Sequence, residues 1–303
     1  MLRRSLLLSP LLLAAQETGR ETVTYKQVGG ANLELDIYHP GGKAARPAVF
    51  WIHGGALIMG SRTGIRQWQL RRYLDAGYAV VSIDYRLAPA TKLPGILADV
   101  EDAWKWLQRE GPRRAIDPKR VAVAGHSAGG YLTLTTGFRC QPRPKALVAF
   151  YGYGDIAADW YAKPDPFYLK QPAVSEEEAR AAVAQPGLPQ RGRFYLWCRQ
   201  QGRWNQEVAG LDPTTQNKQF DPYSPARNAS KNFPPTMLLH GDADTDVPFS
   251  QSEQMDRELR RAGVPCEFVQ IPNGPHGFDG RPESPHAAEA FAKVLVFLKR
   301  YLR

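Results

Sequence analysis

Strand-like apolar runs that alternate with helical segments constrain the fold of this 303-residue chain more than any other feature of its sequence. Runs of this kind are typical of strands that helices cover on both faces of a sheet. They occupy residues 48–52, 78–83, 121–124, 146–150 and 236–240, and a further strand is predicted at residues 266–271. Helical patterns lie between or after them, at 67–76, 94–107, 128 onward, 251–262 and 287–302. The alternation predicts an α/β fold with a doubly wound, mostly parallel sheet.

Two further strand-like segments precede the first of these runs. Residues 22–28 have strand character, and residues 33–38 alternate strictly between apolar and other side chains. Gly29 and Gly30 separate the two segments, and a pair of glycines is a turn signal. The sequence therefore predicts an antiparallel hairpin ahead of the parallel part of the sheet.

The alternation stops between about residues 151 and 232, where the chain becomes aromatic and rich in proline. A stretch of this length is too long for an ordinary connection and too apolar for a linker. We expect this inserted segment to form a lid or cap over one end of the sheet. A short helix is predicted within it, at residues 176–184.

The N-terminal segment, residues 1–15, has the layout of a secretory signal peptide: two arginines, an apolar stretch and two alanines. Its apolar stretch is shorter than the roughly 20 residues of a membrane-spanning helix, and no other segment is long enough. We therefore expect cleavage near Ala15, a secreted or periplasmic protein and no stable membrane anchor. The alternative is the apolar N-terminus of a cytosolic protein. Residues 16–303 are expected to form one domain.

The charge of the chain restricts its partners. The formal net charge is +9, but the basic residues are dispersed among acidic ones, as in residues 257–261. No block of basic residues is interleaved with aromatic ones, so nucleic-acid binding is not expected. An acidic polymer or an anionic membrane surface would also suit a basic protein. A solvated surface explains the dispersed charge better.

Three cysteines are present, Cys140, Cys198 and Cys266, so at least one has no partner within the chain. An oxidising compartment would allow one disulfide, but the sequence does not select the pair. The spacing of the three residues matches no metal site. Buried thiols are the simpler expectation.

The pentapeptide Gly125-His-Ser-Ala-Gly129 matches the pattern G-x-S-x-G and lies between a predicted strand and a predicted helix. Glycines at both ends allow a sharp turn that exposes the serine hydroxyl beside the positive N-terminus of the helix. Ser127 is therefore predicted to be a nucleophile. The alternative is a serine that only caps the helix.

A serine nucleophile needs a general base, and the base needs an acid that orients it. In a fold of this kind they follow in the order Ser, Asp, His, on loops after later strands. His276 is the one histidine of six in the expected position, unless it is a turn histidine bonded to backbone. The loop after the preceding strand offers three acids, Asp242, Asp244 and Asp246, and those not used would cap the loop.

Acyl transfer also needs N–H donors aimed at the oxyanion that develops in the reaction. The tetrapeptide His53-Gly-Gly-Ala56 follows a predicted strand and resembles the HGGG-type loop that supplies such donors. The backbone amides of Gly54, Gly55 or Ala56 are candidates, together with the amide of Ala128. The alternative is a plain glycine turn. His53 is expected to brace the loop.

As a set, these motifs resemble those of the α/β-hydrolase superfamily. The closer resemblance is to hormone-sensitive-lipase-like esterases and to bacterial feruloyl and acetyl esterases. It rests on HGGA at 53–56, DYRLAP at 84–89, GHSAGG at 125–130, HGDxDxxVP at 240–248 and PHGF at 275–278. It covers the core, roughly residues 22–150 and 233–303, and says little about the inserted segment, where substrate selection is expected to lie.

The resemblance implies which acid belongs to the triad, because Asp244 has the offset of the acid in related hydrolases. It also implies a structural role for residues 84–89 and ester hydrolysis without a metal or cofactor. Residues 16–303 are then an α/β-hydrolase domain with a cap insertion at about 151–232. The aromatic residues of the insertion are expected to pack within the cap, with Trp160 or Trp204 as candidates for lining an acyl site.

The function expected from these features is a serine carboxylesterase that forms an acyl-enzyme on short or medium acyl esters or aryl esters. Its substrate is a small-molecule or polysaccharide-linked ester, such as acetylated or feruloylated plant polysaccharide. An amidase, peptidase or arylformamidase of the same fold would share the triad, so only substrate assays separate it. A non-catalytic ligand-binding protein is the third possibility, although such proteins usually lose triad residues. The sequence does not indicate the oligomeric state.

Overall fold

The computed structural model describes residues 19–42, 44–185, 187 and 189–303. The predicted signal peptide, residues 1–15, lies outside the described residues and stays a prediction. Within the described residues, the strands are β1 (Arg20–Val28), β2 (Ala31–Tyr38), β3 (Arg46–Ile52), β4 (Ala79–Ile83), β5 (Ile116–His126), β6 (Ala146–Phe150), β7 (Thr236–Gly241) and β8 (Cys266–Ile271). They form one sheet in the order β1-β2-β4-β3-β5-β6-β7-β8.

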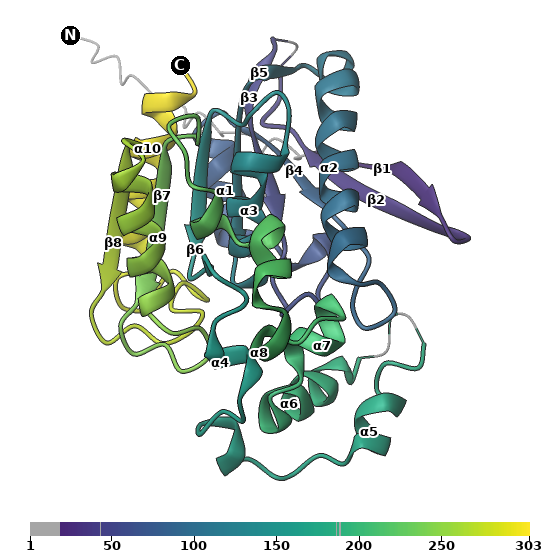
Figure 1. Cartoon of the computed structure of the whole chain (residues 1–303). Helices are drawn as coiled ribbons and strands as arrows, with labels where there is room; N and C mark the ends of the chain where they lie inside the picture. Colours follow the sequence, from purple (N-terminus) through teal and green to yellow (C-terminus); the bar gives the residue numbers. More distant parts are fainter. Residues whose placement is uncertain (1–18, 43, 186, 188) are drawn as a thin grey trace, which may run out of the picture.

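The pairing within this sheet confirms the predicted fold class. β1 and β2 form an antiparallel hairpin, and β2 also pairs antiparallel with β4. All further pairs, from β4 through to β8, are parallel. The parallel strands therefore end at one common edge of the sheet (Figure 1).

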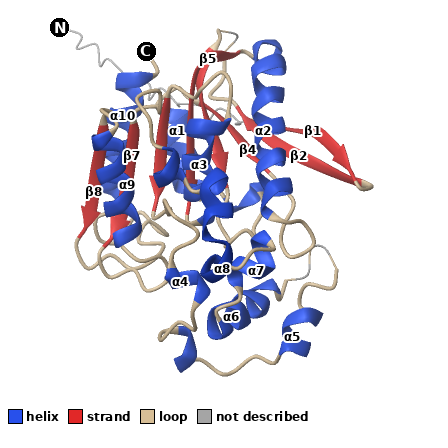
Figure 2. Ribbon diagram, in the orientation of Figure 1, coloured by secondary structure: helices blue, strands red, loops and turns tan. Residues whose placement is uncertain are grey.

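Helices flank this sheet and also fill the inserted segment (Figure 2). The α-helices are α1 (Gln67–Asp75), α2 (Leu93–Glu110), α3 (Ala128–Arg139), α4 (Asp159–Ala162), α5 (Glu176–Ala181), α6 (Arg191–Gln201), α7 (Trp204–Ala209), α8 (Pro213–Gln216), α9 (Ser250–Arg261) and α10 (Ala287–Tyr301). α5 is shorter than predicted, because Val183 N–H donates to the carbonyl of Arg180, three residues back, and the last turn tightens.

The core lies in two layers, one on each face of the sheet. Successive residues of a strand point to opposite faces, as Phe50 and Trp51 of β3 do. Phe50 belongs to an apolar cluster that includes buried side chains of α2, α3 and α9. Trp51 belongs to a second cluster with buried side chains of α1 and α10. The sheet is therefore covered on both faces, as its continuous apolar runs predict.

The inserted segment, residues 151–232, leaves the sheet after β6 and returns to β7. Figure 1 shows its helices α4 and α6 to α8 beyond the edge at which the parallel strands end. The indole of Trp204 donates to the carbonyl of Ala56 at 3.0 Å, so the segment is bonded to the loop after β3. Trp204 is fully buried and stacks on Tyr161 with ring centroids 3.9 Å apart. Aromatic residues of the segment thus pack against one another.

All three cysteines, which lie within the described residues, are free thiols. Cys140 and Cys198 are buried and Cys266 is half-buried. Burial raises the pKa of the Cys140 thiol to about 12, which keeps it protonated at neutral pH. The expectation of buried thiols holds for Cys140 and Cys198.

Neither a membrane span nor a metal site emerges from the described residues. None of their helices combines the length and the apolar character that crossing a bilayer requires. No three His, Cys, Asp or Glu side chains among them are grouped as metal ligands.

A substitution in β7 tests whether this strand lies inside the core. Leu238 is 1% exposed, whereas Leu169 in the inserted segment is 56% exposed. We expect Leu238→Ala to lower the free energy of unfolding by about 2–5 kcal/mol, because it leaves a cavity between packed layers. The same change at Leu169 should cost less than about 0.5 kcal/mol. Urea unfolding measures both; equal losses would contradict the position of β7.

Candidate active site

The turn between β5 and α3 places Ser127 in a strained backbone conformation. Its φ is 55° and its ψ is −121°, values that residues other than glycine rarely adopt. Neighbouring hydrogen bonds hold the turn: Ser127 N–H donates to the carbonyl of Phe150 at 2.9 Å, and Tyr131 N–H donates to that of Ser127 at 3.0 Å. The strand-to-helix turn predicted from the pentapeptide is present, and Ser127 lines a cleft.

The two glycines of the pentapeptide are required by close approach of backbone. A Cβ on Gly129 would lie 2.1 Å from the carbonyl oxygen of Ile52 and 2.6 Å from that of His53. A Cβ on Gly125 would lie 2.3 Å from the carbonyl oxygen of Gly129. These are backbone atoms that cannot rotate away. The glycines therefore let the end of β3 pack directly against the turn that carries Ser127.

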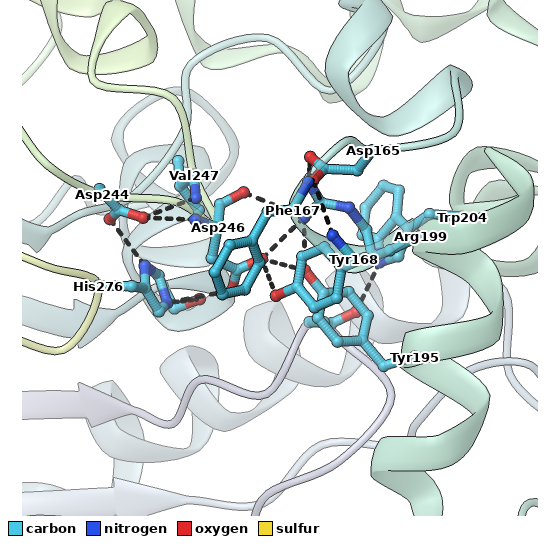
Figure 3. A network of polar contacts seen from close by, with 12 residues as sticks. Asp165, Phe167, Tyr168, Tyr195, Arg199, Trp204, Asp244, Asp246, Val247 and His276 are labelled. Atoms are coloured by element: carbon cyan, nitrogen blue, oxygen red, sulfur yellow. Dashed lines mark hydrogen bonds and ion pairs between the residues drawn. The ribbon is translucent and has the colours of Figure 1, made fainter. Parts of the chain in front are cut away.

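Three of the predicted site residues come together across three loops. His276 Nε2 lies 3.1 Å from Ser127 Oγ, and His276 Nδ1 lies 2.8 Å from Asp244 Oδ2. The other carboxylate oxygen of Asp244 accepts the backbone N–H groups of Asp246 and Val247 at 2.8 and 2.9 Å. These loops follow β5, β7 and β8, in the order that the sequence predicts. Figure 3 shows the Asp244–His276 contact.

The charges around this group set its protonation. Burial alone would raise the pKa of Asp244, but hydrogen bonds from His240 and His276 outweigh burial and hold it below the ordinary value. Burial alone would lower the pKa of His276. The hydrogen bond to Asp244 and the charges of Asp246, Asp244 and Asp279 instead raise it above its ordinary value of 6.5. The arrangement suits an ionised acid beside an imidazole of raised basicity.

The remaining acids of the loop have different surroundings. Asp242 accepts Gln270 Nε2 at 2.9 Å and Asn273 N–H at 2.6 Å, so it caps the loop, as the alternative interpretation predicts. For Asp246 that interpretation is wrong. Its carboxylate bonds to the inserted segment and approaches His276 Nε2 from the cleft, with Oδ2 at 3.4 Å (Figure 3).

The loop after β3 offers free amide groups toward the cleft. Gly54, Gly55 and Ala56 line the cleft, and within the described residues their N–H groups donate to no protein acceptor. Gly55 and Ala56 have positive φ angles of 105° and 56°. Ala128 is fully buried behind Ser127, and its N–H, the first of α3, has no carbonyl within the helix to bind.

His53 braces this loop, as expected. Its Nδ1 lies 2.8 Å from the carbonyl oxygen of Gly54, and its ring stacks on Tyr85 with centroids 4.1 Å apart. Tyr85 in turn donates to the carbonyl of His53 at 2.9 Å. Burial lowers the pKa of His53 to about 4, so the ring is neutral. Residues 84–89 thus contribute to the site by supporting the loop.

Two supporting residues were missed by sequence reasoning. Buried Asp279 accepts Gln69 Nε2 at 2.6 Å and Tyr151 Oη–H at 2.8 Å, and it lies 2.9 Å from His126 Nε2. It joins the His276 loop to the Ser127 turn. Buried His240 lies 3.2 Å from Asp244 Oδ2 and supports the acid. The only sequence signal for Asp279 is that an acidic residue follows His276 at a distance of three residues.

The cleft over these residues has a volume of about 410 Å³. Apolar and aromatic side chains form much of its wall, and the charged side chains of Arg66 and Asp246 also line it. Tyr195 is the residue through which the helices of the inserted segment reach the cleft. Among the described residues that line the cleft, neither Trp160 nor Trp204 appears, so the prediction that one of them lines it is wrong. Trp204 is fully buried and turns its indole to the carbonyl of Ala56.

A family model and curated relatives match most of the chain. The BD-FAE family model matches residues 35–259. A non-reducing polyketide synthase of Aspergillus calidoustus, ausA, is 30% identical in an alignment that spans 320 positions, gaps included, and covers 86% of this chain. The alignment covers only 13% of the synthase, so the chain spans a small part of this relative.

Solved structures share the fold. The propionate-bound esterase Est2 of Thermogutta terrifontis has a TM-score of 0.69 at 22% identity, over 93% of this chain and 94% of that one. The carboxylesterase EstE1, cloned from a metagenomic library, has a TM-score of 0.71 at 22% identity, over 94% and 90%. At such identities the similarity shows the fold alone.

Close packing at Gly129 predicts a sharp response to one methyl group. We expect Gly129→Ala to lower the free energy of unfolding by about 3 kcal/mol or more, because its Cβ would overlap backbone atoms of β3. Gly192→Ala is the matched control, since its Cβ would meet nothing within 4 Å in α6. That change should be neutral or stabilise the protein by up to about 1 kcal/mol. Chemical unfolding compares the two, and a tolerated Gly129→Ala would contradict the close approach.

Proposed function

The chain belongs to the BD-FAE family of α/β-hydrolases, and on that premise we propose that it is a serine carboxylesterase acting through an acyl-enzyme. The family and the fold support an ester hydrolase. The observation that carries the finer proposal is the pair of contacts at His276, 3.1 Å to Ser127 Oγ and 2.8 Å to Asp244 Oδ2. This arrangement is what proton transfer from a serine nucleophile requires.

In the proposed reaction, Ser127 Oγ attacks the ester carbonyl while His276 Nε2 takes the hydroxyl proton. Asp244 holds the ring by accepting Nδ1–H and stabilises the imidazolium that forms. The proton then passes from Nε2 to the leaving alcohol. Water, activated by the same nitrogen, hydrolyses the acyl-enzyme and restores the serine.

The oxyanion of each tetrahedral intermediate needs donors that are already in place. We assign this role to the backbone amides of Gly54, Gly55 or Ala56 and of Ala128. Their support is that none of these N–H groups is bonded within the described part of the chain, and that the loop is braced by His53 and Tyr85. Preorganised donors of this kind contribute several kcal/mol to catalysis.

The proposed substrates are short or medium acyl esters or aryl esters, including acetyl or feruloyl esters of plant polysaccharide. A cleft of about 410 Å³ with the serine at its surface suits acyl groups of that size. Est2, a structural neighbour, holds propionate, a short acyl group. Export through residues 1–15 is proposed on the sequence pattern alone and would bring the enzyme to such polymers. The inserted segment is proposed to act as a cap that shapes the cleft.

Loss of the serine hydroxyl should abolish hydrolysis. We expect Ser127→Ala to lower kcat/KM on 4-nitrophenyl esters from acetyl to dodecanoyl and on methyl ferulate by at least about a thousandfold. Ser230→Ala removes an exposed serine and is the control that should keep full activity. Initial rates on the folded variants measure both.

Two outcomes would contradict the proposal. A folded wild-type protein that cleaves none of these esters but cleaves amides or formanilides would favour the amidase alternative. A protein that cleaves neither class and binds no fluorophosphonate would favour the ligand-binding alternative.

The raised pKa of His276 predicts the pH dependence of activity. Neutral imidazole is the form that accepts the serine proton, so activity is present above the pKa of His276 and is lost as the pH falls through it. Because the pKa lies above 6.5, kcat/KM should begin to fall on the alkaline side of that value. A profile from about pH 5 to about pH 9 with ethyl butyrate avoids a titrating leaving group. A midpoint clearly below 6.5 would contradict the environment of His276.

A further inference from the structure

The two carboxylate oxygens of Asp246 have different surroundings. Oδ1 accepts the hydroxyl of Tyr168 at 2.9 Å, Arg199 Nη1 at 2.7 Å and the hydroxyl of Tyr195. All three donors come from the inserted segment, and Figure 3 shows them converging on Asp246. Within the described residues Oδ2 accepts no hydrogen bond, and its neighbour is His276 Nε2 at 3.4 Å.

The charge of this carboxylate is only partly compensated. Arg199 is 1% exposed and pairs with Asp165 as well as with Asp246, so one guanidinium serves two carboxylates. Asp246 lines the cleft and keeps 17% of its side chain exposed. A fixed, negatively charged acceptor with free lone pairs therefore faces the space that a substrate enters.

The position of Oδ2 places it beside the alcohol part of an ester. In the proposed reaction, His276 Nε2 gives its proton to the leaving alcohol oxygen, so that oxygen lies within hydrogen-bond distance of Nε2. Asp246 Oδ2 is 3.4 Å from the same nitrogen. The carbon next to the ester oxygen, and any group on it, therefore comes close to Asp246.

We propose that Asp246 selects esters whose alcohol part carries a free hydroxyl group beside the ester oxygen, as partly acylated sugars and polyols do. The inference rests on the proposed function, because it uses His276 as the group that protonates the leaving alcohol. The hydroxyl donates to Asp246 Oδ2, and Tyr168, Tyr195 and Arg199 hold the carboxylate in place from the other side. An alcohol part that carries a carboxylate is disfavoured by repulsion.

A pair of esters that differ only in the donor tests this inference. The substrates are 2-hydroxyethyl butyrate and 2-methoxyethyl butyrate, which share the acyl group and the inductive oxygen. The wild-type enzyme is expected to prefer the hydroxyl ester in kcat/KM by about tenfold or more. The hydroxyl ester donates a hydrogen bond to the charged carboxylate of Asp246, whereas the methoxy ester leaves that carboxylate without a donor.

Asp246→Asn should remove this preference while keeping the shape of the side chain. The three donors at Oδ1 hold the amide oxygen on their side, so the amide NH2 faces the cleft and an acceptor becomes a donor. The ratio of the two kcat/KM values should then fall to within about twofold of unity. Asp165→Asn is the matched control: it also weakens the pairing of Arg199, but Asp165 is not part of the cleft wall within the described residues. It should keep the wild-type ratio.

Each other result contradicts the inference. Equal rates of wild type on both esters, with hydrolysis that depends on Ser127, would overturn it and leave the proposed function intact. Loss of the preference in both variants would show that Asp246 acts only through the placement of the inserted segment. A stronger, Asp246-dependent preference for butyrylcholine, a cation without a hydroxyl, would show selection by charge. No hydrolysis of either ester by a protein that cleaves 4-nitrophenyl butyrate would overturn this inference alone. A protein that cleaves none of the three butyrates would contradict the proposed function as well.

Discussion

The approach of β3 to the turn after β5 is the contact on which the rest of the site depends. It requires glycine at 125 and 129, since a Cβ at Gly129 would lie 2.1 Å from the carbonyl oxygen of Ile52. The same approach brings the loop that begins at His53 beside Ser127. One packing constraint thus sets both the strained serine and the amides proposed to bind the oxyanion. The parallel order of β6, β7 and β8 then brings the other loops to the same edge.

Three acidic residues near His276 make different contacts. Asp244 contacts Nδ1, while Asp279 ties the loop that carries His276 to the turn of Ser127 through His126. Asp246 stands on the opposite side of the ring, near Nε2. Its bonds to Tyr195 and Arg199 place the inserted segment next to His276. The inserted segment, whose motifs are not part of the resemblance to esterases, therefore supplies the donors that hold Asp246 for the proposed selectivity.

Much of the fold was predictable because its signals are local. Continuous apolar runs indicated the strands, and the glycines of the pentapeptide around Ser127 predicted the sharp turn between strand and helix. His276 and Asp244 followed from the order of loops and from the resemblance, and the structure brings them together with Ser127. The bonds of Asp246 were not predictable, because Tyr168 and Arg199 lie 78 and 47 residues away in the sequence. The aromatic content of the insertion likewise did not predict which way the side chain of Trp204 points; it is buried in the core.

The most direct test of the central claim is peptide mapping by mass spectrometry after reaction with a fluorophosphonate. The reagent reacts far faster with a serine whose proton is removed by a neighbouring base than with other side chains. The account predicts one adduct per chain, on the peptide that contains Ser127, and none after His276→Ala. An adduct on another residue, or ester hydrolysis without any adduct at Ser127, would contradict it.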